Sequence, residues 1–116
     1  MPDRTTLLLC RGCCCGTTAK APRTDHVAQE QALLSAASGG VEVRVVDCLD
    51  ECDRANVAVV RRPQLPRRER DLWLGGLTTA RATDALVGWL RDGAHGTPPR
   101  ELVGRVFRHL PPRKGR

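Results

Sequence analysis

Residues 5–10 read TTLLLC, two β-branched residues followed by three leucines and a cysteine. This composition predicts a buried strand. Residues 41–47, VEVRVVD, alternate valine with charged residues at their start and predict a second strand. Between the two, Thr24 or Asp25 can cap a helix that runs to about Ser38. A strand, a crossover helix and a second strand imply a parallel pair, which is typical of the α/β class.

The middle of the chain predicts an antiparallel hairpin. Residues 56–62 contain three valines and predict a third strand, and residues 72–74 predict a fourth. The basic segment 63–70, which holds two prolines, forms the turn between them. These two strands add an antiparallel pair to the parallel one, so the expected sheet is mixed.

Two helices are expected after the hairpin. Thr78 or Thr79 can cap a helix to about Arg91, in which apolar residues recur at the spacing of an amphipathic helix. A proline pair then precedes a short final helix at residues 100–107. The order β-α-β-β-β-α is the thioredoxin-like layout, a four-stranded mixed sheet with helices packed on its faces.

Length and composition fit one folded domain. The chain has 116 residues, with an expected core over about 5–92 and a basic C-terminal extension over about 93–116. Hydrophobic residues make up 41% of it, which is enough to build a core. The longest apolar run is far shorter than the ~18 residues that span a membrane, and the N-terminal apolar stretch is too short for a signal peptide. We therefore expect a soluble, cytoplasmic protein.

The six cysteines form two tight clusters, at positions 10, 13, 14 and 15 and at positions 48 and 52. Because the cytoplasm keeps thiols reduced, such clusters are more often metal ligands or redox groups than disulfides. Cys10 ends the first expected strand and Cys48 ends the second. Parallel neighbours lie about 4.8 Å apart, so both clusters would open at the same edge of the sheet. Four thiolates at one edge suit a tetrathiolate metal site or an iron–sulfur cluster.

The spacings lead to a resemblance. Residues 48–60, CLDECDRANVAVV, look like the second cysteine pair and following strand of the thioredoxin-like [2Fe-2S] ferredoxins. That family includes the small cluster-carrying subunit of NADH dehydrogenase, whose C-x4-C first pair is similar to Cys10 and Cys15. Residues 73–78, WLGGLT, and the helix to Arg91 resemble the family's closing hairpin and helix. The resemblance covers about residues 5–92.

The resemblance implies a site and a function. Its four thiolate ligands, two for each iron, would be Cys10, Cys15, Cys48 and Cys52. Because Cys13 and Cys14 lie in the same loop, either is an alternative to Cys15 as the second ligand. The implied function is one-electron transfer to a redox enzyme partner, with no bond-making chemistry, by a protein that forms a homodimer.

Two other function classes remain open. Cys10-Arg11-Gly12-Cys13 is a C-x-x-C directly after the first strand, as in thiol–disulfide redox proteins, which use an exposed thiolate of low pKa. No proline stands at residues 55–56, where thioredoxins keep one beside their cysteines. Alternatively, the adjacent thiols at 13–15 suit a zinc-binding or metal-trafficking module.

Charge adds two expectations. Carboxylates at positions 47, 50, 51 and 53 surround the second cysteine pair, where they would lower a cluster's potential and offer a docking rim. The net charge is +6, and the arginines of the hairpin are expected to form a solvated face: Arg61, Arg62, Arg67, Arg68 and Arg70. With few aromatic residues and no recognised motif, we expect no nucleic-acid binding. The histidines at 26, 95 and 109 are expected at the surface, and His26 is the one that can approach the first cysteine loop.

Overall fold

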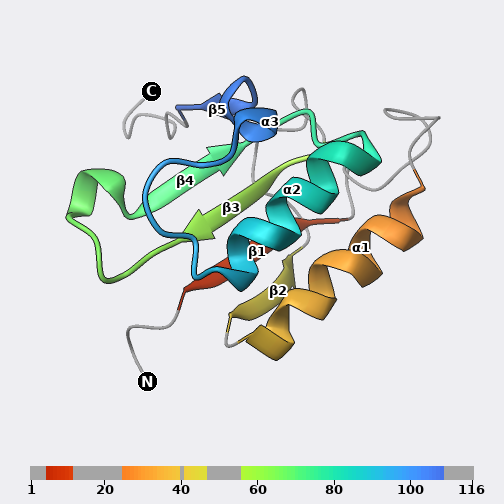
Figure 1. The fold of residues 1–116 in the computed structure, drawn as a ribbon, viewed down its shortest axis with the longest axis horizontal. Helices are drawn as coiled ribbons and strands as arrows, with labels where there is room; N and C mark the ends of the chain where they lie inside the picture. The colour runs from red at the N-terminus through yellow and green to blue at the C-terminus, as the bar shows by residue number, and fades with distance from the viewer. Residues whose placement is uncertain (1–4, 12–24, 40, 47–55, 109–116) are drawn as a thin grey trace, which may run out of the picture.

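The structure, a computed structural model, describes residues 5–11, 25–39, 41–46 and 56–108. Its centre is a five-stranded mixed sheet, which confirms the expected α/β class. In spatial order the strands are β2 (Glu42–Val46), β1 (Thr6–Cys10), β3 (Ala58–Arg61), β4 (Asp71–Leu74) and β5 (Val106–Phe107). Figure 1 shows the sheet behind the two longer helices.

Two of the pairings among the first four strands follow the sequence analysis, and the antiparallel pairing of β1 with β3 joins them. Strand β1 runs parallel to β2, with Cys10 beside Val46 at the far end of the pair. It runs antiparallel to β3, which forms the expected antiparallel pair with β4. The turn between β3 and β4 contains the short 3-10 helix η3 (Arg67–Glu69). The predicted parallel pair and hairpin are both confirmed.

The four-stranded count was wrong, because the last segment adds a strand. The expected helix over 100–107 is only α3 (Arg100–Val103), and β5 follows it and pairs antiparallel with β4. Gly104 caps the helix, and the next residues place the Arg105 carbonyl where the Gly75 N–H donates to it, at 2.9 Å. Valine and phenylalanine favour strands, and the edge of β4 offers them backbone partners.

Both longer helices begin at predicted caps. Helix α1 (His26–Leu34) starts after Asp25, whose carboxylate accepts from the Ala28 N–H at 2.9 Å, and continues as the 3-10 helix η1 (Ser35–Gly39). Helix α2 (Ala80–Arg91) starts after Thr79, whose hydroxyl accepts from the Ala82 N–H at 3.1 Å. These side-chain oxygens satisfy donors that have no partner within the helix.

The two faces of the sheet have different surroundings. Helices α1 and α2 lie on the same face and contact each other (Figure 1). Leu7 and Leu9 of β1 belong to the main core with residues of both helices. Because successive strand residues face opposite sides, Cys10 falls on the other face, in a smaller cluster with Val57. Among the described residues, no helix is long and apolar enough to cross a membrane.

Candidate functional site

Most of the predicted site lies outside the described residues. The structure describes Cys10, while the other five cysteines, the four carboxylates near the second pair and His109 fall in undescribed ranges: Cys13, Cys14, Cys15, Cys48, Cys52, Asp47, Asp50, Glu51, Asp53 and His109. We call residues 12–24 the first cysteine segment and residues 47–55 the second. What the structure shows is how the residues that flank these two segments are held.

Cys10 is buried at the end of β1. Its residue is 2% exposed, and its N–H donates to the carbonyl of Val57 at 3.1 Å. Trp73 and Phe107 pack against the small apolar cluster of Cys10 and Val57, and their ring centroids lie 5.8 Å apart in an edge-to-face arrangement. Among the described residues, the side chains grouped with Cys10 are apolar or aromatic, and Cys10 itself is almost fully shielded from bulk water.

The two cysteine segments start side by side. Arg11, the last residue before the first segment, donates its N–H to the carbonyl of Val46 at 2.8 Å, and Val46 is the last residue before the second segment. Described residues after the two segments also meet. His26, the second residue after the first segment, has its Nδ1 3.1 Å from Nδ2 of Asn56, which directly follows the second segment. The expected adjacency of the two strand ends is confirmed, and the structure adds this second contact.

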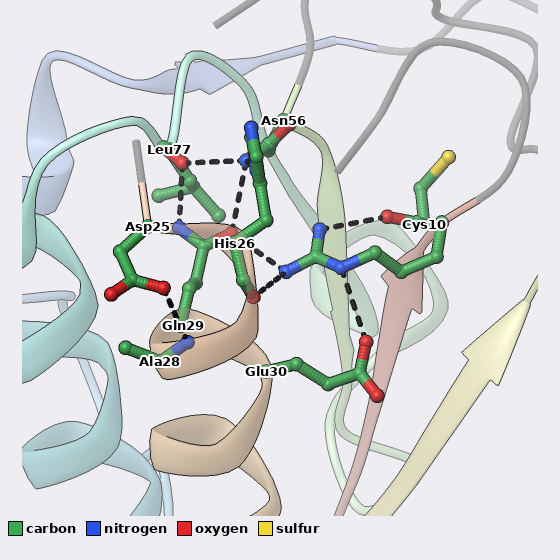
Figure 2. Close-up of polar contacts among 9 residues, drawn as sticks. Cys10, Asp25, His26, Ala28, Gln29, Glu30, Asn56 and Leu77 are labelled. Atoms are coloured by element: carbon green, nitrogen blue, oxygen red, sulfur yellow. Dashed lines mark hydrogen bonds and ion pairs between the residues drawn. The ribbon is translucent and has the colours of Figure 1, made fainter. Parts of the chain in front are cut away.

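The Arg11 side chain contacts several of these flanking residues. Figure 2 labels its partners Cys10, His26, Gln29 and Glu30. Its Nη1 donates to the Cys10 carbonyl at 3.1 Å, and its Nε forms an ion pair with Glu30 at 3.3 Å. Its Nη2 donates to Gln29 Oε1 at 2.9 Å and reaches the His26 carbonyl at 3.4 Å. The Arg11 side chain is only 13% exposed, so its charge is largely compensated within the protein.

Gln29 is the centre of the network. It is 4% exposed, and its Oε1 also accepts from Asn56 Nδ2 at 3.0 Å. Its Nε2 donates to the Leu77 carbonyl at 2.7 Å and to the Thr83 hydroxyl at 3.0 Å. Asn56 is fully buried and exchanges contacts with Leu77, donating from Nδ2 at 3.3 Å and accepting at its carbonyl at 3.0 Å. Buried polar groups are costly unless they are paired, and these are paired.

Sequence reasoning missed most of this network. It did not single out Arg11, Gln29, Glu30 or Asn56, and it treated His26 as a surface residue although His26 is half-buried against Asn56. One signal was present: Gln29 shares the buried stripe of the first helical segment with Leu33 and Ala36, at spacings of four and seven residues. A glutamine at a core position of a helix needs buried partners.

The basic hairpin turn is not wholly the expected solvated face. Arg62 is 6% exposed and donates to the carbonyls of Glu69 at 2.9 Å and Gly96 at 3.2 Å. Its guanidinium lies over the Trp89 ring, 5.5 Å from the centroid. Burial lowers the pKa of Arg62, and the nearby Glu69 carboxylate opposes that shift. Arg61 beside it pairs with Asp71 at 3.0 Å, so part of the expected surface charge is compensated internally.

Neither a metal-binding group among the described residues nor a known relative identifies the site. Within the described ranges, no group of three or more histidine, cysteine, aspartate or glutamate side chains could hold a metal ion. No protein family, curated protein or solved structure matches the chain. The described residues that bear on function are therefore Cys10 and those that flank the two cysteine segments.

Proposed function

We propose that the protein is a [2Fe-2S] ferredoxin that carries single electrons to a redox enzyme partner. The ligands proposed are Cys10, Cys15, Cys48 and Cys52, with Cys13 and Cys14 as the alternatives to Cys15. One observation carries the proposal. Cys10 is buried where the flanking residues of both cysteine segments meet.

The described surroundings fit such a ligand. Cys10 belongs to a small apolar cluster with Val57, against which Trp73 and Phe107 pack, and its burial limits access of water. When bound, an iron–sulfur cluster supplies reversible one-electron chemistry, at a potential set by charge, hydrogen bonds and exposure. The Arg11 guanidinium donates to the Cys10 carbonyl, so its positive charge lies beside this ligand and favours reduction of the cluster. The Glu30 carboxylate offsets part of that charge.

The proposal includes a thioredoxin-like fold. The order β2-β1-β3-β4, with a parallel first pair and an antiparallel hairpin, supports it, and β5 is then an addition at the edge of β4. A ferredoxin of this kind works in the cytoplasm and meets a protein partner, with no role for nucleic acid or membrane. The family resemblance extends the proposal to a homodimer.

The thiol–disulfide reading is less well supported by the geometry. A redox-active C-x-x-C needs an exposed thiolate as its nucleophile. Cys10, the first cysteine of that motif, is 2% exposed. Burial in apolar surroundings raises the cost of a thiolate unless a positive partner or a metal ion compensates it.

The test is anaerobic purification followed by a visible spectrum and assays of iron, acid-labile sulfide and zinc. The proposal expects red-brown protein with equal iron and sulfide, two of each per chain. Replacing Cys13, Cys14 and Cys15 one at a time with serine then identifies the second ligand. Colourless protein with one zinc per chain would replace the proposal with the metal module. Metal-free protein that cycles a disulfide and cannot be reconstituted with iron and sulfide would replace it with the thiol redox reading.

A further inference from the structure

We propose that Gln29 is a positioning residue that couples the two cysteine segments through a single atom, its Oε1. This inference rests on the proposed function for its meaning at the cluster. Oε1 accepts from Arg11 at 2.9 Å and from Asn56 at 3.0 Å. Arg11 directly follows Cys10 and precedes the first segment, whereas Asn56 directly follows the second segment. One oxygen is thus shared by the supports of both.

The orientation of both amides follows from their partners. An arginine only donates and a backbone carbonyl only accepts, so Gln29 must turn its oxygen to Arg11 and its nitrogen to Leu77. Asn56 then faces two acceptors, Gln29 Oε1 and the Leu77 carbonyl, and must present its nitrogen to them. Since each choice determines the next, the two side chains have one arrangement in which all these contacts are made.

The network is also tied to the core. Gln29 Nε2 donates to the Leu77 carbonyl, which precedes α2, and to the Thr83 hydroxyl within α2. The shared oxygen therefore has a fixed position relative to the second helix, not only relative to the cysteine segments. Loss of that oxygen would leave Arg11 Nη2 and Asn56 Nδ2 each short of a buried acceptor, which affects both segments together.

The first experiment compares cluster-loaded variants. Gln29→Met keeps the length of the side chain and removes its amide, and Gln31→Met is the matched control at an exposed position of the same helix. We expect Gln29→Met to lose its cluster roughly tenfold faster, as one charged hydrogen bond would cause, and to change the electron paramagnetic resonance spectrum of the reduced cluster. Gln31→Met should match the wild type in both measurements.

Gln29→Glu separates positioning from general stability. It keeps an oxygen for Arg11 and Asn56 but cannot donate to Leu77 or Thr83. We expect this variant to unfold at lower denaturant concentration while retaining the wild-type resonance spectrum. If Gln29→Met retains that spectrum and the wild-type rate of cluster loss, or if Gln29→Glu changes the spectrum as much as Gln29→Met does, the inference is overturned.

A second experiment needs no cluster. Arg11→Met and Asn56→Ala are combined in a double-mutant cycle on the protein as purified, with the midpoint of urea unfolding as readout. Because either donor alone still satisfies the shared oxygen, only the double variant leaves it buried without these partners, and the double variant should lose more than the sum of the single losses. In a Gln29→Met background the losses should add. Additive losses in the wild-type background would overturn the coupling, whereas absence of iron from the wild type would overturn the proposed function alone.

Discussion

Arg11 and Arg62 occupy equivalent places at opposite ends of the sheet. Each directly follows the last residue of a strand, and those strands, β1 and β3, are antiparallel. Arg11 is paired with Glu30 and with the buried amide of Gln29. Arg62 donates to backbone carbonyls and lies over a tryptophan ring, and its pKa is lowered by burial.

The two arginines therefore differ in role: Arg11 holds residues beside the candidate site, whereas Arg62 only stabilises the fold. Among the described residues, no acceptor lies within hydrogen-bond distance of Arg62 Nε, and its carbonyl partners belong to the hairpin turn and to residues after α2. The contacts of Arg11 lead instead to the residues that flank both cysteine segments. We therefore expect changes at the Arg11 end to alter the properties of the proposed cluster, and changes at the Arg62 end to alter stability alone.

The largest effect is expected at the Arg11 end, from Cys10→Ser. Serine has nearly the same shape but is a poor ligand for iron, so the cluster should be lost or bound at a small fraction of the wild-type amount. Iron and sulfide assays measure this, and far-ultraviolet circular dichroism checks that the fold is kept. Full iron content in folded Cys10→Ser would remove Cys10 from the ligand set.

Arg62→Met should lower the free energy of unfolding more than a change at Arg11 does. It removes charged donors from two partly buried hydrogen bonds, at about 1 kcal/mol for each, so we expect the free energy of unfolding to fall by roughly 2 kcal/mol. Arg61→Met is the matched control, because its exposed pair with Asp71 contributes about 0.5 kcal/mol or less. Urea unfolding measures both. A changed iron content per folded molecule in Arg62→Met would contradict the separation of the two ends.

Arg11→Lys is expected to have a smaller effect on stability and a specific effect on the cluster. Lysine keeps the charge but cannot reach Glu30, Gln29 and the Cys10 carbonyl together, since it lacks the planar fork. We expect a loss of about 1 kcal/mol and cluster loss several-fold faster than in the wild type. Arg44→Lys, at an exposed position of β2, is the control. Equal rates of cluster loss in Arg11→Lys and Arg44→Lys would mean that Arg11, like Arg62, contributes to stability alone.

These two ends also show what the sequence could predict. The leucine run of β1 and the valines of β2 have a clear strand pattern, so the parallel pair and the position of Cys10 at its end followed from local signals. Strand β5 has only two residues and thus no period to detect. Its existence depends on the free edge of β4, which is a property of the assembled sheet.

The polar contacts were out of reach for a different reason. Gln29 meets Asn56 across 27 positions and Leu77 across 48, and no local pattern encodes such pairs. Arg62 was expected to be solvated because it belongs to a run of arginines beside a basic, proline-rich turn. It is buried because Trp89 of α2 covers it, a contact between distant segments. Tertiary packing determines which of several neighbouring arginines has a buried side chain.

The smallest expected effect is a proton position on His26, and it tests the amide orientations directly. Asn56 must present Nδ2 to Gln29 and Leu77, and the same nitrogen lies 3.1 Å from His26 Nδ1. Because an amide nitrogen cannot accept, a proton on His26 Nδ1 would point at another donor, so the neutral ring carries its proton on Nε2. Nitrogen-15 shifts of the histidine ring at a pH where it is neutral should show this tautomer. The exposed ring of His95 provides the reference in the same spectrum.

In Gln29→Met the constraint on Asn56 is weakened, because one of its two acceptors is gone. The His26 tautomers should then approach the mixture of an unconstrained imidazole, while those of His95 stay unchanged. A proton on His26 Nδ1 in the wild type would mean that Asn56 is turned the other way. In that case Gln29 Oε1 would accept no hydrogen bond from Asn56, and the proposed coupling of Arg11 and Asn56 through that oxygen would be wrong.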